Sequence, residues 1–201
     1  MTRRPSAVLA RALGLLERSG LLLLQDPLLP SLATLVAGEA VRGSWWSHPA
    51  GREIFRTAGA LEDHPDVLCA KLVSGKVTFV HRRLWPALVA VGRAREEWQT
   101  VGLGGEARSL LARVDEEGRV LAAGKAAAEL ERRLLVASAQ VHTPSGAHAL
   151  ELSSWEGFAR SAGLPLRKRS VERARAELTA AVGALSAEHG GRARLPWDGR
   201  G

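Results

Sequence analysis

Residues 125–152 read KAAAELERRLLVASAQVHTPSGAHALEL and carry the most information about the fold. From Lys125 to Leu135 the leucines recur at helical spacing, which predicts an amphipathic helix. Residues 135–142 and 147–152 are short runs on either side of the sequence Thr-Pro-Ser-Gly at 143–146. Two such runs around a turn containing Pro and Gly predict a β-hairpin. We therefore expect a helix that leads directly into two antiparallel strands.

The residues before this segment predict two further elements. The apolar residues of 106–114 share one face of a helix, and residues 118–121 break that helix and begin a second short element. The second half thus reads helix, helix, helix and then hairpin. This order resembles a winged-helix domain, in which the last helix leads into the wing through a sequence motif such as Leu130-Glu131-Arg132-Arg133-Leu134-Leu135-Val136. The resemblance covers residues 106–156.

The resemblance implies that residues 125–135 lie in the recognition-helix position and that Pro144-Ser145-Gly146 forms the wing tip. We associate it with bacterial winged-helix proteins of DNA repair, including glycosylases and abasic-site lyases. A helix that reads the major groove is usually basic, whereas this one presents two acids and two bases, Glu129, Glu131, Arg132 and Arg133. Winged-helix domains also act as protein–protein interaction modules, which is an alternative function for this half.

The composition favours a polyanionic partner. The chain has 201 residues and a net charge of +7, and 46% of its residues are hydrophobic. That hydrophobic fraction is ordinary for a folded protein, and an excess of basic residues favours binding to nucleic acid or to anionic lipid surfaces. We expect the partner to be double-stranded DNA, intact or damaged, and the location to be cytoplasmic and nucleoid-associated.

The chain lacks the features of a secreted or membrane protein. Its single cysteine, Cys69, excludes an intrachain disulfide and a cysteine-rich zinc site, and fits a reducing compartment. Residues 21–24 are all leucine, but QDPLLP at 25–30 interrupts them far short of the ~20 apolar residues that a membrane span needs. We therefore expect core packing there and no membrane partner.

The first half predicts helices and one β-hairpin. Two apolar runs at 67–73 and 76–80 flank the two-residue turn Ser74-Gly75. The predicted helices cover residues 6–24, 31–41, 50–61 and 87–97. The fold class is mainly α with small β-hairpins, an α+β protein with a winged helix-turn-helix in its C-terminal half. We divide it into a helical domain with a hairpin at 67–80 (1–101), a winged-helix domain (106–156) and a basic helix with a loose tail (157–201).

The last segment is basic. From Arg160 onward nine residues are Arg or Lys and four are Asp or Glu. The cluster Arg167-Lys168-Arg169 precedes a helix predicted over 171–187, and residues 190–201 are rich in Gly and Arg, which predicts a loose end. A cationic tail of this kind favours salt-dependent phosphate binding. The alternative is a solvated helix with a disordered end.

The first candidate site is the connector RGSWWSHP at residues 42–49. Trp45 and Trp46 are adjacent in a turn, which lets one indole project beside Arg42, His48 and Arg52. An exposed indole flanked by cations is suited to stacking on a base or to wedging into a duplex. The alternative is a pair of core aromatics under a loop.

The second candidate site lies on the predicted hairpin. Only four of the 28 basic residues are lysines, and two of the four, Lys71 and Lys76, lie here. A lysine among apolar neighbours has a lowered pKa and can attack the aldehyde of an abasic site, or it can simply extend from a strand edge into water. The residues predicted to bind DNA around it are Thr78, His81, Arg82 and Arg83.

The third candidate site is the predicted wing tip, with His142, Ser145 and His148. Two imidazoles across a hairpin contact phosphate or hydrogen-bond the turn; zinc is less favoured because only Glu151 is near enough in sequence to be a third ligand. The complete predicted set for DNA binding adds Arg132, Arg133, Arg167, Lys168 and Arg169.

The function predicted from these patterns is DNA binding, with Lys71 or Lys76 as the amine of a repair lyase or glycosylase that acts on damaged or abasic DNA. The alternative is a regulator or architectural protein that binds DNA without catalysis. The sequence has no P-loop, dinucleotide fingerprint or HExxH motif, so we predict no cofactor and no metal.

Overall fold

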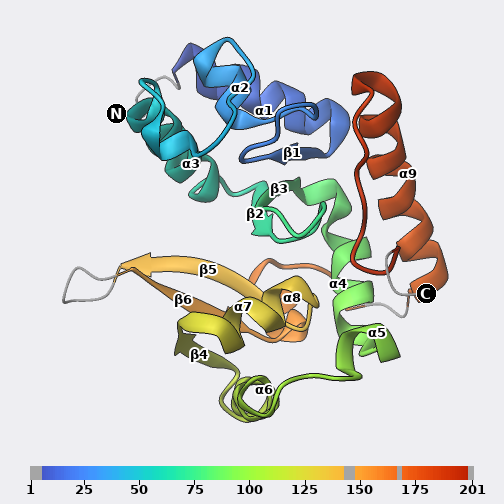
Figure 1. Cartoon of the computed structure of the whole chain (residues 1–201). Coiled ribbons are helices and arrows are strands. Elements are labelled where there is room, and N and C mark those ends of the chain that lie inside the picture. The colour runs from blue at the N-terminus through green and yellow to red at the C-terminus, as the bar shows by residue number, and fades with distance from the viewer. Residues whose placement is uncertain (1–5, 143–147, 167–168, 199–201) are drawn as a thin grey trace.

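This computed structural model describes residues 6–142, 148–166 and 169–198. Within them, the first half of the chain forms a three-stranded antiparallel sheet with helices packed on it, in the strand order β1-β3-β2 (Figure 1). Its elements are α1 Ala7–Ser19, β1 Leu21–Leu23, α2 Leu32–Ala37, α3 Gly51–Glu62, β2 Val67–Ala70 and β3 Thr78–His81, with a 3-10 turn at Trp45–Ser47.

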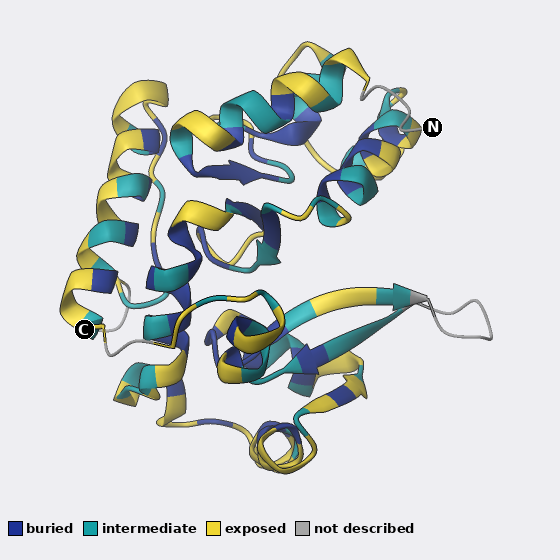
Figure 2. Ribbon diagram, turned by 180° about the vertical axis from the view of Figure 1, so that it is seen from behind, coloured by how far each residue is buried: buried dark blue, intermediate teal, exposed yellow. Residues whose placement is uncertain are grey.

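The two faces of this sheet pack against different layers. Leu22 and Phe79 face α1, α2 and α3, whereas Leu21 and Val80 face a second layer built from α4, α8 and α9. Side chains that alternate along a strand point to opposite faces, so a sheet covered on both sides needs apolar residues at every position. This is why β1 is all leucine and is buried along its whole length (Figure 2).

The second half contains the remaining helices and a second antiparallel sheet, in the order β4-β6-β5. Its elements are α4 Trp85–Ala94, α5 Glu97–Thr100, α6 Gly105–Glu117, β4 Arg119–Ala122, α7 Gly124–Arg132, β5 Ala137–His142, β6 His148–Ser153, α8 Trp155–Ser161 and α9 Val171–His189, after a 3-10 turn at Arg82–Leu84. The hairpin predicted after residue 135 is confirmed as β5 and β6, with Ala137 paired to Ser153. The α+β class is confirmed as well.

Two predicted boundaries are wrong because tertiary pairing overrides local pattern. The helix predicted over 6–24 ends at Ser19, since Gly20 takes a left-handed conformation (φ 82°) and the following leucines pair with β3 instead. The element predicted at 118–121 is strand β4, not the second of three helices. A short apolar run fits a helix or a strand equally well by pattern alone, so the presence of a partner strand determines which of the two it forms.

The predicted two-residue turn at Ser74-Gly75 is confirmed. Both residues take positive φ values, 52° and 69°, and the N–H of Lys76 donates to the carbonyl of Val73 at 2.9 Å. Positive φ at both central residues is the pattern of a type I′ hairpin turn. Strand pairing stops before this turn, so residues 71–77 form a loop.

The tail predicted to be loose is docked over its described residues. The N–H of Ser74 donates to the carbonyl of Arg194 at 2.7 Å, and the N–H of Arg194 donates to Ser74 Oγ. Leu195 is buried in the largest core cluster, and Trp197 packs edge-on against Trp98. The Gly- and Arg-rich composition of 190–201 predicted a loose end wrongly, because a few buried apolar side chains are enough to hold a segment that is otherwise small and polar. The tail therefore supports the 71–77 loop.

One large core unites the predicted regions. It takes residues from β1 and β3, from α4, from α8 and from α9, and Figure 1 shows α9 running alongside α4. A second, smaller core joins α6, β4, α7 and β6. The described helices include none whose length and apolar character would let it cross a bilayer.

Candidate nucleic-acid interface

Three loops meet at one edge of the first sheet and enclose a pocket. The antiparallel register pairs Leu23 and Ala70 with Thr78, so the ends of β1 and β2 and the start of β3 lie at the same edge. The pocket has a volume of about 570 Å³. We call it the Trp45 pocket; it is lined by Leu24, Gln25, Pro27, Val41, Arg42, Gly43, Trp45, Lys71, Gly75, Lys76 and Val77.

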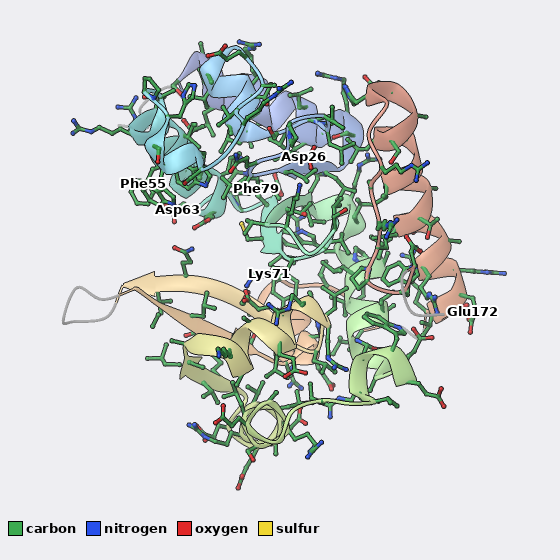
Figure 3. All side chains as sticks on the ribbon, in the orientation of Figure 1. Asp26, Phe55, Asp63, Lys71, Phe79 and Glu172 are labelled. Atoms are coloured by element: carbon green, nitrogen blue, oxygen red, sulfur yellow. The ribbon has the colours of Figure 1, made fainter. Side chains whose placement is uncertain are left out.

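Lys71 lies between the two halves of the molecule (Figure 3). Its Nζ donates to Oε2 of Glu131 at 2.7 Å, and Oγ of Ser138 donates to Oε1 of the same carboxylate at 2.7 Å. Glu131 lies in the last turn of α7 and is buried, so the ammonium neutralises a carboxylate that water barely reaches. An ion-paired ammonium is not a nucleophile. The catalytic role of Lys71 stays a prediction, and it requires this ion pair to open.

Lys76 forms a similar ion pair on the other side of the loop. Its Nζ donates to Oδ2 of Asp26 at 2.7 Å, while Oδ1 accepts the backbone N–H groups of Leu28 and Leu29. Burial alone would raise the pKa of Asp26, but the hydrogen bonds from Leu29, Lys76 and Leu28 together outweigh it, so that pKa lies below its ordinary value. Asp26 is therefore ionised at neutral pH. The ammonium of Lys76 remains half-exposed.

Arg42 supplies the uncompensated charge of the pocket. It is exposed, and it forms no ion pair with the residues that the structure describes. Since the carboxylates of Glu131 and Asp26 neutralise the two lysines, the pocket carries a surplus of one positive charge. An anion that enters the pocket can contact Arg42 and the half-exposed side chain of Lys76, which both line it.

Trp45 and Trp46 form an aromatic stack beside the pocket. Their ring centroids are 4.1 Å apart with planes inclined by 23°, and Phe55 of α3 packs against Trp46 at 5.4 Å. Trp46 is 63% exposed, and Trp45 packs in part against Val41 and Ile54. One indole is thus anchored and the other projects, as the turn predicted, and the alternative of two core aromatics is wrong.

A glycine lets α3 begin close to this stack. A Cβ at Gly51 would lie 2.9 Å from the carbonyl oxygen of Trp45, so no larger residue fits without a shift. His48 shapes the same turn, since its Nδ1 accepts the N–H of Ala50 and its Nε2 lies 3.6 Å from Glu39. Arg52 is exposed on the first turn of α3. The connector therefore presents its aromatic and cationic groups from a supported backbone.

The other hairpin residues of the predicted site lie away from the pocket. Thr78 was predicted to bind DNA, but it is fully buried; its hydroxyl donates to the carbonyl of Lys76 and accepts the N–H of Val73. This assignment is corrected, because a ligand cannot reach the hydroxyl. His81 accepts the N–H of Arg83 through Nδ1 and begins the 3-10 turn after β3.

Arg82 and Arg83 make contacts within the protein and do not line the pocket. Arg82 pairs with Asp66 at 3.0 Å and lies over the ring of Trp85. Arg83 donates to the carbonyl of Arg18 near the end of α1 at 2.9 Å. Both residues are exposed, so their DNA binding stays a prediction.

In the second half, neighbouring arginines have different environments. Arg132 is exposed on α7, whereas Arg133 is buried and donates to the carbonyls of Gln99, Val101 and Gly102. Arg133 was predicted to face DNA, and this assignment is corrected. Its guanidinium instead hydrogen-bonds to the segment that connects α5 to α6 and stabilises it.

The remaining predicted residues are described only in part. Arg169 pairs with Glu177 at the start of α9. Ser145, Arg167 and Lys168 lie outside the described residues, as do the side chains of His142 and His148. Among the described residues, no three His, Cys, Asp or Glu side chains are grouped so that they could hold a metal ion.

Sequence reasoning missed the carboxylates and the amide of the site. Asp26 and Glu131 pair with lysines 50 and 60 positions away, and Gln25 reaches the carbonyls of Val41 and Gly43. No local pattern indicates such partners, because they are set by how the loops meet. A comparison with protein-family models, curated proteins and solved structures found no match for this chain.

Proposed function

We propose that this protein binds DNA through the Trp45 pocket and the aromatic stack beside it. The observation that carries the proposal is that two candidate sites chosen separately from the sequence contribute to one pocket: Trp45 and Arg42 come from the connector, and Lys71 and Lys76 from the hairpin. Indole surface beside cations is the combination that holds a base and its phosphate. The net charge of +7 adds a long-range attraction to any phosphodiester chain.

The second sheet is proposed as a further DNA contact of the winged-helix type. Figure 1 shows β5 and β6 as a long hairpin that projects from the body of the protein. Arg132 and Lys125 are exposed on α7, the helix before the hairpin. A helix that carries cations beside a projecting hairpin is suited to the grooves and backbone of a duplex. The hairpin would then extend the contact that begins at the pocket.

The replacement Arg42→Ala tests the pocket. Because Arg42 supplies its surplus charge, we expect the variant to bind a labelled oligonucleotide about tenfold more weakly, the loss of one charged hydrogen bond. The slope of log affinity against log salt should fall by about 1, as for one lost phosphate contact. Fluorescence anisotropy over a series of salt concentrations measures both quantities.

Arg11→Ala is the matched control for this experiment. Arg11 is exposed on α1 and does not line the pocket, so its removal changes the net charge equally without touching the site. If the two variants lose affinity to the same extent, binding depends on overall charge and the pocket is not the site. If the unmodified protein binds no DNA at low salt, the proposed function is wrong.

Amine chemistry on abasic DNA is the second candidate function, because both predicted lysines line the pocket. A Schiff base needs a neutral amine. The side chain of Lys76 is more exposed than that of Lys71, 46% against 26%, so we expect Lys76 to separate from its carboxylate partner more easily. We expect borohydride to trap a covalent adduct with abasic DNA that disappears in Lys76→Ala. The absence of an adduct in the unmodified protein would leave DNA binding without catalysis.

A further inference from the structure

We propose that the Trp45 pocket receives a single unpaired nucleotide, with its base against the indole of Trp45 and its phosphate on Arg42 and Lys76. This inference rests on the proposed function and specifies the form of DNA that the site recognises. It makes the pocket a reader of extrahelical or single-stranded nucleotides and not of paired duplex.

The size of the pocket supports one nucleotide. Its volume of about 570 Å³ lies within the ~300–1,000 Å³ of pockets that enclose small molecules. A paired duplex does not enter such a space; it lies across a surface and meets cations spread along its backbone. Here the cations come from two loops, 41–45 and 71–77, and converge on the same hollow.

The polar groups of the pocket match the two ends of a nucleotide. Arg42 has no ion pair among the described residues, and Lys76 is exposed beyond its bond to Asp26, so both can donate to a phosphate. Gln25 donates through Nε2 to the carbonyls of Val41 and Gly43. This bond fixes the amide and directs its Oε1 to accept from another group, such as the exocyclic amine of a base.

The apolar groups of the pocket match the base. Leu24, Pro27 and Val77 line the wall with Trp45, whose indole packs against the core cluster that contains Val41 and Ile54 and also stacks on Trp46. A side chain that is already fixed loses little entropy when a ligand stacks on it, so the affinity gained from stacking is larger. Trp45 therefore offers a base the part of its indole that lines the pocket and that neither the core nor Trp46 covers.

Pairing within DNA decides which nucleotides can use this surface. In a duplex both faces of a base are stacked on its neighbours, and the Watson–Crick edge is occupied. A bulged, flipped or single-stranded base has a free face and a free edge. Placing it in a pocket therefore costs little or no free energy of unstacking. The site should therefore discriminate by pairing state and only weakly by base identity.

The experiment compares three probes of the same sequence: a fully paired duplex, a duplex with one bulged nucleotide and a single strand. We expect the bulged duplex and the single strand to bind about tenfold more tightly than the paired duplex, a ratio that corresponds to one stacked base. A 2-aminopurine at the bulge should lose fluorescence on binding. Equal affinity for the three probes overturns this inference and leaves the proposed function in place; binding to none of them overturns the proposed function.

The variants Trp45→Ala and Trp46→Ala locate the stacking surface. We expect Trp45→Ala to remove the preference for unpaired DNA and Trp46→Ala to retain most of it. If Trp46→Ala alone abolishes the preference, the base lies on the exposed stack and not in the pocket. Because Trp45 also packs on the core, photocrosslinking of a bulged 5-iodouracil to the unmodified protein is the second measurement: an adduct within 24–27, 41–45 or 71–77 supports the assignment, and an adduct confined to other residues contradicts it.

Discussion

Replacing Gly92 with alanine is expected to destabilise the protein by about 3 kcal/mol, the upper range for an overpacked core. A Cβ at Gly92 would lie 2.2 Å from Nε1 of Trp155. Trp155 cannot move aside, because it is buried and its Nε1 donates to the carbonyl of Leu134 at 2.7 Å. Alanine normally favours a helix over glycine by about 1 kcal/mol, so the expected sign is opposite to that of helix propensity.

Gly183→Ala is the control, since no described atom lies within 4 Å of a Cβ placed there in α9. This variant should gain about 1 kcal/mol from helix propensity alone. Denaturant unfolding, with the slope of each transition compared to that of the unmodified protein, gives both free energies of unfolding. If Gly92→Ala is as stable as the unmodified protein, α4 does not pack on Trp155 as described. The contact packs α8, which follows the hairpin, against α4 within the large core that also takes residues of β1 and β3.

Replacing Arg133 with alanine is expected to cost about 3 kcal/mol, the scale on which a buried ionic network loses one partner. The guanidinium donates to three backbone carbonyls, of Gln99, Val101 and Gly102, and lies 3.1 Å from the carboxylate of Glu129. Lysine should restore little of this stability, because a single ammonium cannot reproduce the fork of five N–H donors.

The neighbouring residue provides the comparison that separates structure from DNA binding. Arg132 is exposed on α7, so Arg132→Ala should change the free energy of unfolding by less than about 0.5 kcal/mol while weakening binding to a duplex. Thermal or denaturant unfolding, together with anisotropy on the same samples, tests both halves of the statement. An Arg133→Ala variant of unchanged stability and reduced DNA affinity would restore the assignment made from the sequence.

These two arginines show what a local sequence pattern can and cannot predict about the direction of a side chain. Both fall within the amphipathic helix predicted over 125–135 and both were assigned to its outer face, yet only Arg132 is there. The helix ends at Arg132, so the direction of Arg133 depends on the turn that follows and on the 99–102 segment that happens to pass beside it. The same limit explains β1: four leucines after a helix fit its continuation, and only the strand β3, more than 50 residues later in the chain, turns three of them into a strand.

Features that depend on near neighbours in the chain could be predicted from the sequence. They are most of the helices, the two-residue turn at Ser74-Gly75, the hairpin after residue 135 and the closeness of Trp45 to Trp46. Helical and strand periods and the positive φ of a turn arise within a few residues, so the order of amino acids is enough to define them. Which cations keep a free charge depended on the folded molecule alone. Asp26 and Glu131 neutralise Lys76 and Lys71 across 50 and 60 positions, and electrostatic pairing acts through space, where distance along the chain has no influence.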